Sequence, residues 1–139
     1  MPFFLERSDS YFWPVTVKEA QDGGKHRKYT FEAQFKRVGQ ARREELGHQL
    51  LIQKGRVQAG RLEERDKDGN MVPIKLLTPR EMADELLVGW RKIMDREVEG
   101  GEEVPFNEAL KAELLEIENV AEAILEAWNE SQPGAKVGN

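Results

Sequence analysis

Hydrophobic and polar residues alternate along two stretches near the start of the chain, residues 12–18 and residues 29–36. Strict alternation places every second side chain on the same face, which is the pattern of a β-strand with one buried side. Asp22-Gly23-Gly24 lies between the two stretches and has the composition of a hairpin turn. We therefore predict an N-terminal β-hairpin. Its first strand should lie at the edge of a sheet, because Pro14 cannot donate a backbone hydrogen bond.

Beyond the second stretch, the spacing of the hydrophobic residues changes to that of a helix. Leu46 and Leu50 predict a helix over residues 40–54, which could extend to Gly60. Residues 62–77 follow no clear period and contain turn-forming residues and a proline, so we expect a loose, exposed loop there.

A second helix is marked by its capping residues. In Thr78-Pro79-Arg80-Glu81, threonine caps the helix, proline takes the first helical position and glutamate completes a capping box. The sequence that follows presents Met82, Leu86 and Trp90 at a spacing of four residues. This spacing predicts a helix that carries all three side chains on one face.

The remainder of the chain predicts a short hairpin and further helices. Gly100-Gly101, between Trp90 and Phe106, predicts the second hairpin, and Asn107 is a suitable N-cap for the helical region after it. A hydrophobic stripe at helical spacing then runs towards the C-terminus, and it consists of Leu110, Leu114, Ile117, Val120 or Ala121, Ile124 and Trp128.

Together these patterns predict an α+β fold, in which an N-terminal β-hairpin packs on a small bundle of three or four helices. A short second hairpin lies between helices. Residues 1–131 would form a single domain and residues 132–139 a flexible C-terminal tail, because proline and glycine end the last helix. We expect Trp90 and Trp128 to be buried and to tie two helices together. The predicted structural anchors are Trp90, Phe106, Leu114, Ile124 and Trp128.

The composition agrees with a single globular domain. The chain of 139 residues has the length of one domain, and 39% of its residues are hydrophobic, which is too many for a disordered chain. It contains no run of about 20 apolar residues of the kind that spans a membrane. The first residues do not have the pattern of a signal peptide, and the absence of cysteine excludes disulfides and thiol chemistry.

No motif in the sequence predicts catalysis, a cofactor or a metal site. Asp66-x-Asp68-x-Asn70 resembles the start of an EF-hand loop, but Met71 stands where that loop needs glycine and Leu77 where it needs glutamate. His26 and His48 lie in different predicted elements, and neither has a second histidine at metal-ligand spacing. No glycine-rich phosphate loop occurs, and no acidic pair lies in an apolar context that would make a general acid. We therefore predict a protein that is not an enzyme and uses no cofactor.

The formal net charge of −5 is distributed unevenly along the chain. Residues 1–61 have 12 lysines and arginines against 7 acidic residues, whereas residues 62–139 have 9 against 19. Two interpretations of the basic half stay open, a solvated face or a surface for a partner or single-stranded nucleic acid. The strand alternation favours the first, because it places aromatic rings and lysines on opposite faces. The residues of the candidate surface are Arg27, Lys28, Lys36, Arg37, Arg42 and Arg43.

The second half of the chain contains an ordered series of short motifs. Leu86-Leu87-Val88-Gly89-Trp90 is followed by Asp95, a glycine turn and Val104-Pro105-Phe106-Asn107. The closing helices continue the series with Leu110, Leu114-Leu115, Val120, Ala123-Ile124 and Ala127-Trp128. Upstream, residues 31–37 have the form of an opening strand. In this order and spacing, residues 26–131 resemble the tail assembly chaperones of long-tailed bacteriophages.

The resemblance implies a function without enzymatic activity. Such chaperones bind the tape measure protein, a very long and largely helical chain, and keep it soluble until tail tube subunits polymerise around it. A longer frameshifted product, made by many of these phages, recruits the tail tube protein. The resemblance places the protein in the host cell cytoplasm and outside the mature virion. It implies no nucleic-acid or membrane partner, and it leaves self-association open.

The sequence differs from the usual family pattern after the tryptophan, and an alternative function stays open. Lys92-Ile93 stands where the family often has Gly-Val after the tryptophan. The alternative function is a small nucleic-acid-binding module that uses the basic N-terminal half of the chain.

Overall fold

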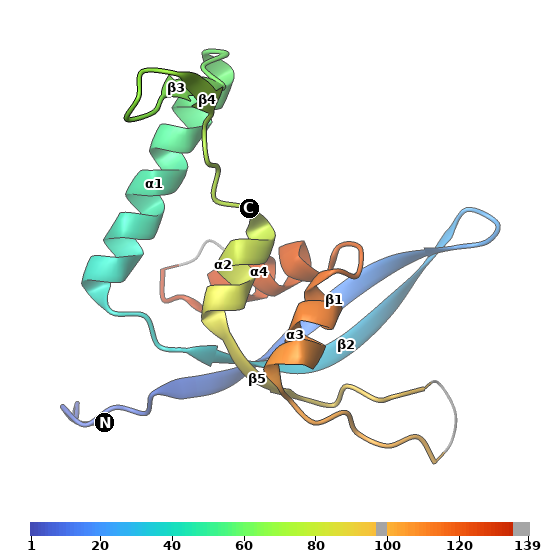
Figure 1. Ribbon diagram of the computed structural model, residues 1–139. Helices are drawn as coiled ribbons and strands as arrows, with labels where there is room; N and C mark the ends of the chain where they lie inside the picture. The colour runs from blue at the N-terminus through green and yellow to red at the C-terminus, as the bar shows by residue number, and fades with distance from the viewer. Residues whose placement is uncertain (97–99, 135–139) are drawn as a thin grey trace. The chain divides into compact units, whose positions relative to one another are not determined.

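The computed structural model describes residues 1–96 and 100–134 and has an α+β fold, as predicted (Figure 1). Contacts divide the chain into two compact units, Met1–Arg37 with Pro79–Asn139, and Val38–Thr78. The assignment of residues 1–131 to one domain stays a prediction. The elements in chain order are β1 (Ser10–Gln21), β2 (Lys25–Lys36), α1 (Gln40–Gln58), β3 (Glu63–Arg65), β4 (Met71–Pro73), α2 (Pro79–Leu86), β5 (Leu87–Arg91), α3 (Glu108–Leu115) and α4 (Val120–Ser131).

The N-terminal hairpin is confirmed. β1 and β2 pair antiparallel from Ser10 opposite Lys36 to Gln21 opposite Lys25, and the turn contains the predicted glycines. Gly23 and Gly24 both have positive φ, at 82° and 75°, a conformation that glycine adopts without steric cost. In the three-stranded sheet of order β1-β2-β5, β1 is an edge strand, as Pro14 predicts.

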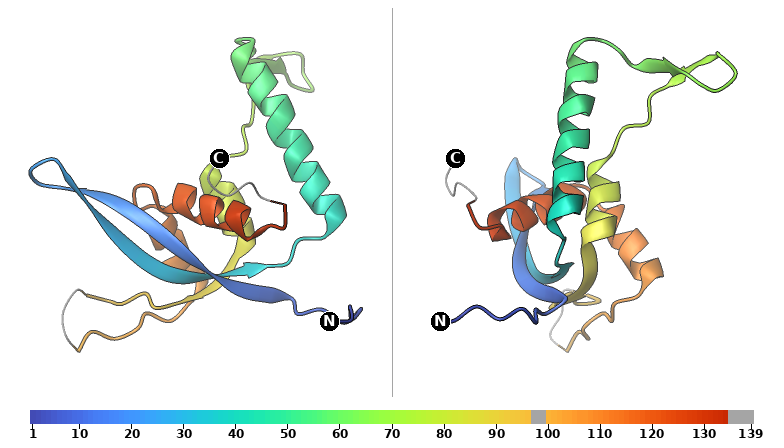
Figure 2. Two further views of the ribbon diagram at one scale, coloured as in Figure 1. Left: turned by 180° about the vertical axis from the view of Figure 1, so that it is seen from behind. Right: turned by 90° about the vertical axis from the view of Figure 1, so that its left-hand side faces the viewer.

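Alternation along the hairpin creates the core of the first unit. Val15, Phe31, Ala33 and Phe35 are buried on one face of the sheet, because successive side chains of a strand point to opposite faces. α2 and α4 lie on one side of this sheet, with α3 beside α2 (Figures 1 and 2). The buried side chains of these helices, among them the fully buried Ile124, close the core.

The second predicted helix is shorter than expected. α2 ends at Leu86, β5 begins at Leu87 without a loop, and Trp90 lies in that strand opposite Ala33 of β2. The prediction that Trp90 lies on a helix was wrong. Without β5, the backbone N–H and C=O groups along one edge of β2 would have no partner in the sheet, and β5 pairs with them. Gly89 fits the close approach there, since a Cβ on this residue would lie 2.1 Å from the side-chain oxygen of Gln34.

A buried lysine of α3 fixes this junction between helix and strand. The Lys111 ammonium donates hydrogen bonds to the carbonyl oxygens of Asp84, at 2.8 Å, and Leu87, at 3.1 Å. It also lies 3.1 Å from the carboxylate of Asp84 and 3.4 Å from that of Glu108, and the residue is only 5% exposed. The last carbonyls of a helix have no partner within the helix, so Lys111 satisfies the Asp84 carbonyl that α2 leaves open and also binds the first carbonyl of β5.

The second predicted hairpin is confirmed on both sides of its tip. The backbone N–H of Val104 donates to Ile93, at 2.7 Å, and Met94 pairs with Glu103. Residues 97–99 of the predicted hairpin lie outside the described residues. Asn107 then caps α3 as predicted, because its side-chain oxygen accepts from the backbone N–H of Leu110 at 2.8 Å.

The hydrophobic stripe of the closing region forms two helices. α3 and α4 are separated by a turn in which Asn119 has φ of 67°, a left-handed conformation that asparagine tolerates better than most residues. Leu115, rather than the predicted Leu114, is the buried leucine at the end of α3. Trp128 is half-buried, and the expectation that it would be buried was wrong.

The predicted tail begins with contacts to the sheet. The Gln132 side-chain amide donates to the hydroxyl of Tyr11 at 3.1 Å, and Tyr11 itself shares a hydrogen bond of 2.7 Å with Ser131. Residues 135–139 of the tail lie outside the described residues.

The second unit contains a hairpin where the sequence predicted a loose loop. β3 and β4 pair antiparallel, and the Asp66 carboxylate accepts backbone hydrogen bonds from Asp68 and Asn70, both at 2.9 Å. The prediction of a loose loop was wrong. The turn around Asp66 joins two strands that are too short for an alternation of hydrophobic and polar residues to be recognised in the sequence. The Gln53 side chain of α1 also donates to the carbonyl of Leu77 and accepts from its N–H, which fastens the returning chain to the helix. Among the helices described in either unit, none is long and apolar enough to cross a bilayer.

We expect Lys111→Met to lower the free energy of unfolding by about 2 kcal/mol, because it retains an apolar side chain but leaves the two buried carbonyls without a donor. Urea denaturation measures this change. Lys54→Met is the matched control, since Lys54 is an exposed lysine within a helix. Equal stability of the two variants would show that the ammonium contributes nothing to the junction.

Candidate interaction surface

An apolar groove opens on the surface of the first unit. It lies between the β1–β2 hairpin, residues 92–96 and the turn that joins α3 to α4, and its volume is about 420 Å³. This size falls within the range of about 300–1,000 Å³ that is usual for ligand sites. The groove is lined by Val17, Glu19, Tyr29, Thr30, Phe31, Lys92, Ile93, Met94, Arg96, Leu114, Ile117 and Val120.

The floor of the groove is part of the core, whereas its rim exposes large apolar side chains. Val17, Phe31 and Val120 are at most 7% exposed, but Met94 is 50% exposed and Ile117 is 48% exposed. Met94 lies on one arm of the second hairpin, where it pairs with Glu103, and Ile117 lies in the α3–α4 turn. The groove therefore offers apolar area that no described part of its own unit covers.

The charged side chains around the groove are mostly basic. Lys92 and Arg96 belong to the lining, and the Arg27 guanidinium lies 5.4 Å from the ring centre of Tyr29. Glu19 is the acidic residue of the lining and stands opposite Arg27 in the hairpin register. The lining thus contains two cations and one carboxylate, and the ammonium of Lys92 lies 3.7 Å from the carboxylate of Glu32.

The predicted anchors separate into core and groove residues. The Trp90 indole N–H donates to the carbonyl of Val104 at 2.8 Å, and its ring meets the edge of Phe106 with centres 4.8 Å apart. Trp90 is buried and Ile124 is fully buried. Leu114 is half-buried because it belongs to the lining of the groove.

The predicted basic residues do not gather into one patch. Of the six, Arg27 stacks over Tyr29 but is not part of the groove lining, whereas Lys28 lines a separate polar hollow together with Glu122 and Glu126 of α4. Lys36 is eight residues further along β2, which corresponds to about 26 Å of extended strand. Its neighbour Arg37 stacks over Tyr11, with 4.9 Å to the ring centre. Arg42 and Arg43 belong to α1 in the other unit.

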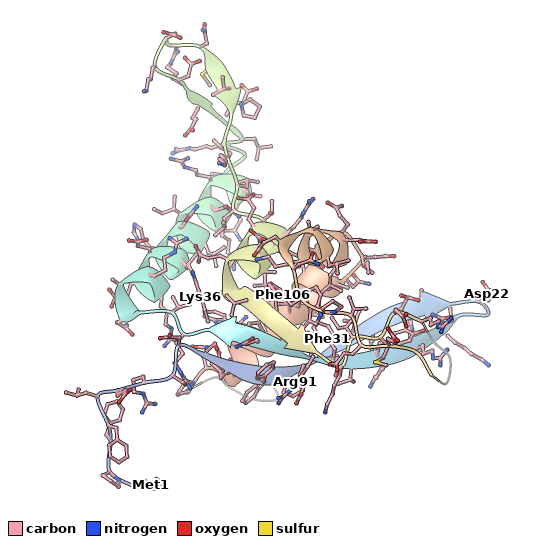
Figure 3. The ribbon with its side chains drawn as sticks, turned by 60° about the horizontal axis from the view of Figure 1, so that its bottom comes forward. Met1, Asp22, Phe31, Lys36, Arg91 and Phe106 are labelled. Carbon is pink, nitrogen blue, oxygen red and sulfur yellow. The ribbon has the colours of Figure 1, made fainter. Side chains whose placement is uncertain are left out.

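The opposite face of the sheet carries a charged cluster that sequence reasoning missed, and it is centred on Arg91, which is labelled in Figure 3. Arg91 donates a hydrogen bond to the carboxylate of Glu32 and stacks over Phe12, with 3.9 Å to the ring centre. Lys92 lies 3.7 Å from the same carboxylate. The hydrogen bond from Arg91 lowers the pKa of Glu32, although partial burial opposes the shift. Only the register of β5 on β2 places Arg91 opposite Glu32, so the spacing along the chain held no signal for this pair.

Within residues 1–96 and 100–134, no group of three or more histidine, aspartate or glutamate side chains is arranged to hold a metal ion.

We expect Arg91→Met to raise the pKa of Glu32 towards its ordinary value of 4.5, because the variant removes the hydrogen bond that favours the carboxylate. NMR titration of the Glu32 side chain measures this change, with Arg61→Met as the control in the other unit. A lowered pKa stabilises the fold above the pKa of the unfolded chain, and this contribution disappears as the pH falls through the folded value. The stability difference between wild type and Arg91→Met should therefore shrink below pH 4.5. An unchanged pKa of Glu32 in Arg91→Met would contradict this account.

Comparisons with known proteins found no match to this chain among family models, curated proteins or solved structures.

Proposed function

We propose that this protein is a tail assembly chaperone of the long-tailed phage kind, without enzymatic activity. It binds the tape measure protein in the host cell cytoplasm, keeps it soluble, helps to recruit tail tube subunits and is absent from the mature virion. The ordered motifs over residues 26–131 support this proposal. These motifs include Val88-Gly89-Trp90, which forms part of β5, and Phe106-Asn107, which leads into α3.

The observation that carries the proposal is the apolar groove with its exposed rim. A long helical chain that awaits assembly exposes apolar stripes, and these stripes aggregate unless another surface covers them. An amphipathic helix can place such a stripe in a hydrophobic groove. Met94 suits this task, because methionine is unbranched and adapts its shape to different partners.

The nucleic-acid alternative predicts a different behaviour. A protein that neutralises several phosphates should bind DNA at low salt and release it steeply as the salt concentration rises. The hollow lined by Lys18 and Lys28 also contains Glu122 and Glu126, and these two carboxylates offset the two cations that a phosphate backbone would need. This arrangement favours the chaperone proposal.

We expect coexpression with the tape measure protein, encoded as a long helix-rich reading frame nearby, to raise the soluble fraction of that protein several-fold. Met94→Gln combined with Ile117→Ser should remove most of this effect, because it makes the rim of the groove polar. The measurement is the amount of tape measure protein in the supernatant and its copurification with the chain.

Met71→Gln combined with Val57→Ser is the matched control for that experiment. Met71 and Val57 are 53% and 46% exposed, close to the values of the two rim residues, but they lie in the other unit. Equal loss in both double variants would contradict a specific role of the groove, and a tape measure protein that stays insoluble with the wild-type chain would contradict the function.

We expect no salt-sensitive binding of generic DNA or RNA, because the acidic closing region opposes it. Fluorescence anisotropy of a labelled oligonucleotide over a salt series tests this expectation. Micromolar binding at low salt that disappears as salt is added would favour the nucleic-acid module instead.

A further inference from the structure

We propose that the groove binds the N-terminal segment Pro2-Phe3-Phe4-Leu5 of a second copy of this chain, and that two copies exchange these segments in a reciprocal dimer. The groove has an apolar rim that its own unit leaves uncovered, and the same unit presents an apolar segment that is uncovered as well. The inference goes beyond the proposed function, because it concerns a contact between two copies of the chain.

The N-terminal segment exposes three consecutive large apolar side chains. Phe3, Phe4 and Leu5 are each at least 60% exposed. Among the described residues, Phe3 has a ring contact with Arg7 of the same segment, whose guanidinium lies 4.7 Å from the ring centre. Figure 3 shows Met1 at the end of this segment, beyond the end of β1. A contiguous apolar patch of this kind marks an interaction site.

The groove offers an apolar surface that suits aromatic side chains. Its floor is formed by the buried side chains of Val17, Phe31 and Val120, and its rim by the exposed Met94 and Ile117. Methionine sulfur makes favourable contacts with aromatic rings, and aromatic rings pack well edge to face with one another. Phenylalanine side chains from a partner would therefore find suitable neighbours on both the floor and the rim.

The charges of the groove suit a neutral occupant. Its lining contains two cations, Lys92 and Arg96, and one carboxylate, Glu19. The Lys92 ammonium already lies 3.7 Å from the carboxylate of Glu32. Pro2-Phe3-Phe4-Leu5 has no charged side chain. Its insertion therefore brings no additional charge into apolar surroundings, where an unpaired charge is costly.

The segment is too short to fill the groove of its own chain. The Arg37 guanidinium donates a hydrogen bond to the Ser8 hydroxyl at 3.2 Å, which holds Ser8 beside the sheet. Leu5 lies three residues before Ser8, so it reaches at most about 11 Å from that residue. The groove begins at Phe31, which stands opposite Val15, about 17 Å of extended strand beyond the start of β1. The three side chains can therefore enter the groove together only from another copy.

The area of a reciprocal contact corresponds to that of a stable dimer. An aromatic side chain buries about 150–250 Å² when it is covered, so the three side chains of one segment bury about 400 Å². With the matching area of the groove, one contact buries about 800 Å² and two reciprocal contacts about 1,600 Å², which is the usual size of a specific interface. A single contact stays below that size, which favours mutual exchange.

The first test is the oligomeric state of the full chain. Sedimentation velocity over a series of micromolar concentrations should show a monomer that converts to a dimer and to no larger species. Phe3→Ser combined with Phe4→Ser should weaken dimerisation by at least about tenfold, because it removes both rings from the contact. The segment lies outside every helix and strand, so this variant should melt at the temperature of the wild type. The matched control is Leu51→Ser combined with Leu62→Ser, which changes two exposed leucines of the other unit and should leave the dimer unchanged.

The second test locates the contact. The chain contains no cysteine, so an introduced cysteine reports on one position. A tagged Leu5→Cys chain mixed with an untagged Met94→Cys chain should form a disulfide-linked heterodimer when copper phenanthroline oxidises the two thiols. The matched control replaces Met94→Cys by Met71→Cys, at an equally exposed methionine of the other unit. Its yield should be about tenfold lower, because only a bound segment has a high effective concentration beside the rim.

The outcomes separate this inference from the proposed function. A chain that stays monomeric, species larger than a dimer, an unchanged dimer in the Phe3 and Phe4 variant, or equal disulfide yields at Met94 and Met71 would each overturn the inference. A monomeric chain that still keeps the tape measure protein soluble would reject the dimer and uphold the function. A segment-exchanged dimer together with an insoluble tape measure protein would uphold the inference and reject the function.

Discussion

The ammonium of Lys111 is the interaction on which the arrangement of the first unit depends. A charged group this deeply buried is costly unless it is paired, and here two main-chain carbonyls and two carboxylates surround it. Because the carbonyls belong to the end of α2 and the start of β5, one side chain from α3 holds three elements together. The same contact allows the chain to change from helix to strand within one residue. β5 can then pair with β2 and complete the sheet.

The groove is a consequence of this arrangement. Once β5 lies on β2, the chain that follows it continues as residues 92–96 along the edge of the groove. The Trp90 indole bonds the returning strand at Val104, which holds both sides of the second hairpin in place. Ile117 remains exposed because it lies in the turn between α3 and α4, and Met94 is exposed on one arm of the second hairpin. The apolar rim thus follows from the turns that the core requires.

Charge is organised by the tertiary structure rather than by the halves of the sequence. The basic N-terminal half does not form one basic surface, because Arg27 and Lys28 lie on different sides of the hairpin and Lys36 lies at its other end. The cations of the groove lining, Lys92 and Arg96, follow β5, whereas Arg27 lies outside the lining on β2. Glu19 stands opposite Arg27 and Glu32 lies beside Lys92, so these cations do not form the continuous track that binding of a phosphate backbone needs.

The sequence by itself determined the features that depend on neighbouring residues. The alternation of hydrophobic and polar residues predicted the N-terminal hairpin, and Asp22-Gly23-Gly24 predicted its turn. Pro14 predicted that β1 lies at the edge of the sheet, and Asn107 predicted where α3 begins. Each of these features depends on local backbone geometry. Only the tertiary structure decided that Trp90 belongs to a strand, because the spacing of Met82, Leu86 and Trp90 suits a helix until the edge of β2 supplies hydrogen bonds. The pair of Arg91 with Glu32 and the groove likewise depend on register between distant segments. Side chains far apart in the sequence meet only when strands pair and helices pack, so no periodicity along the chain could have indicated them.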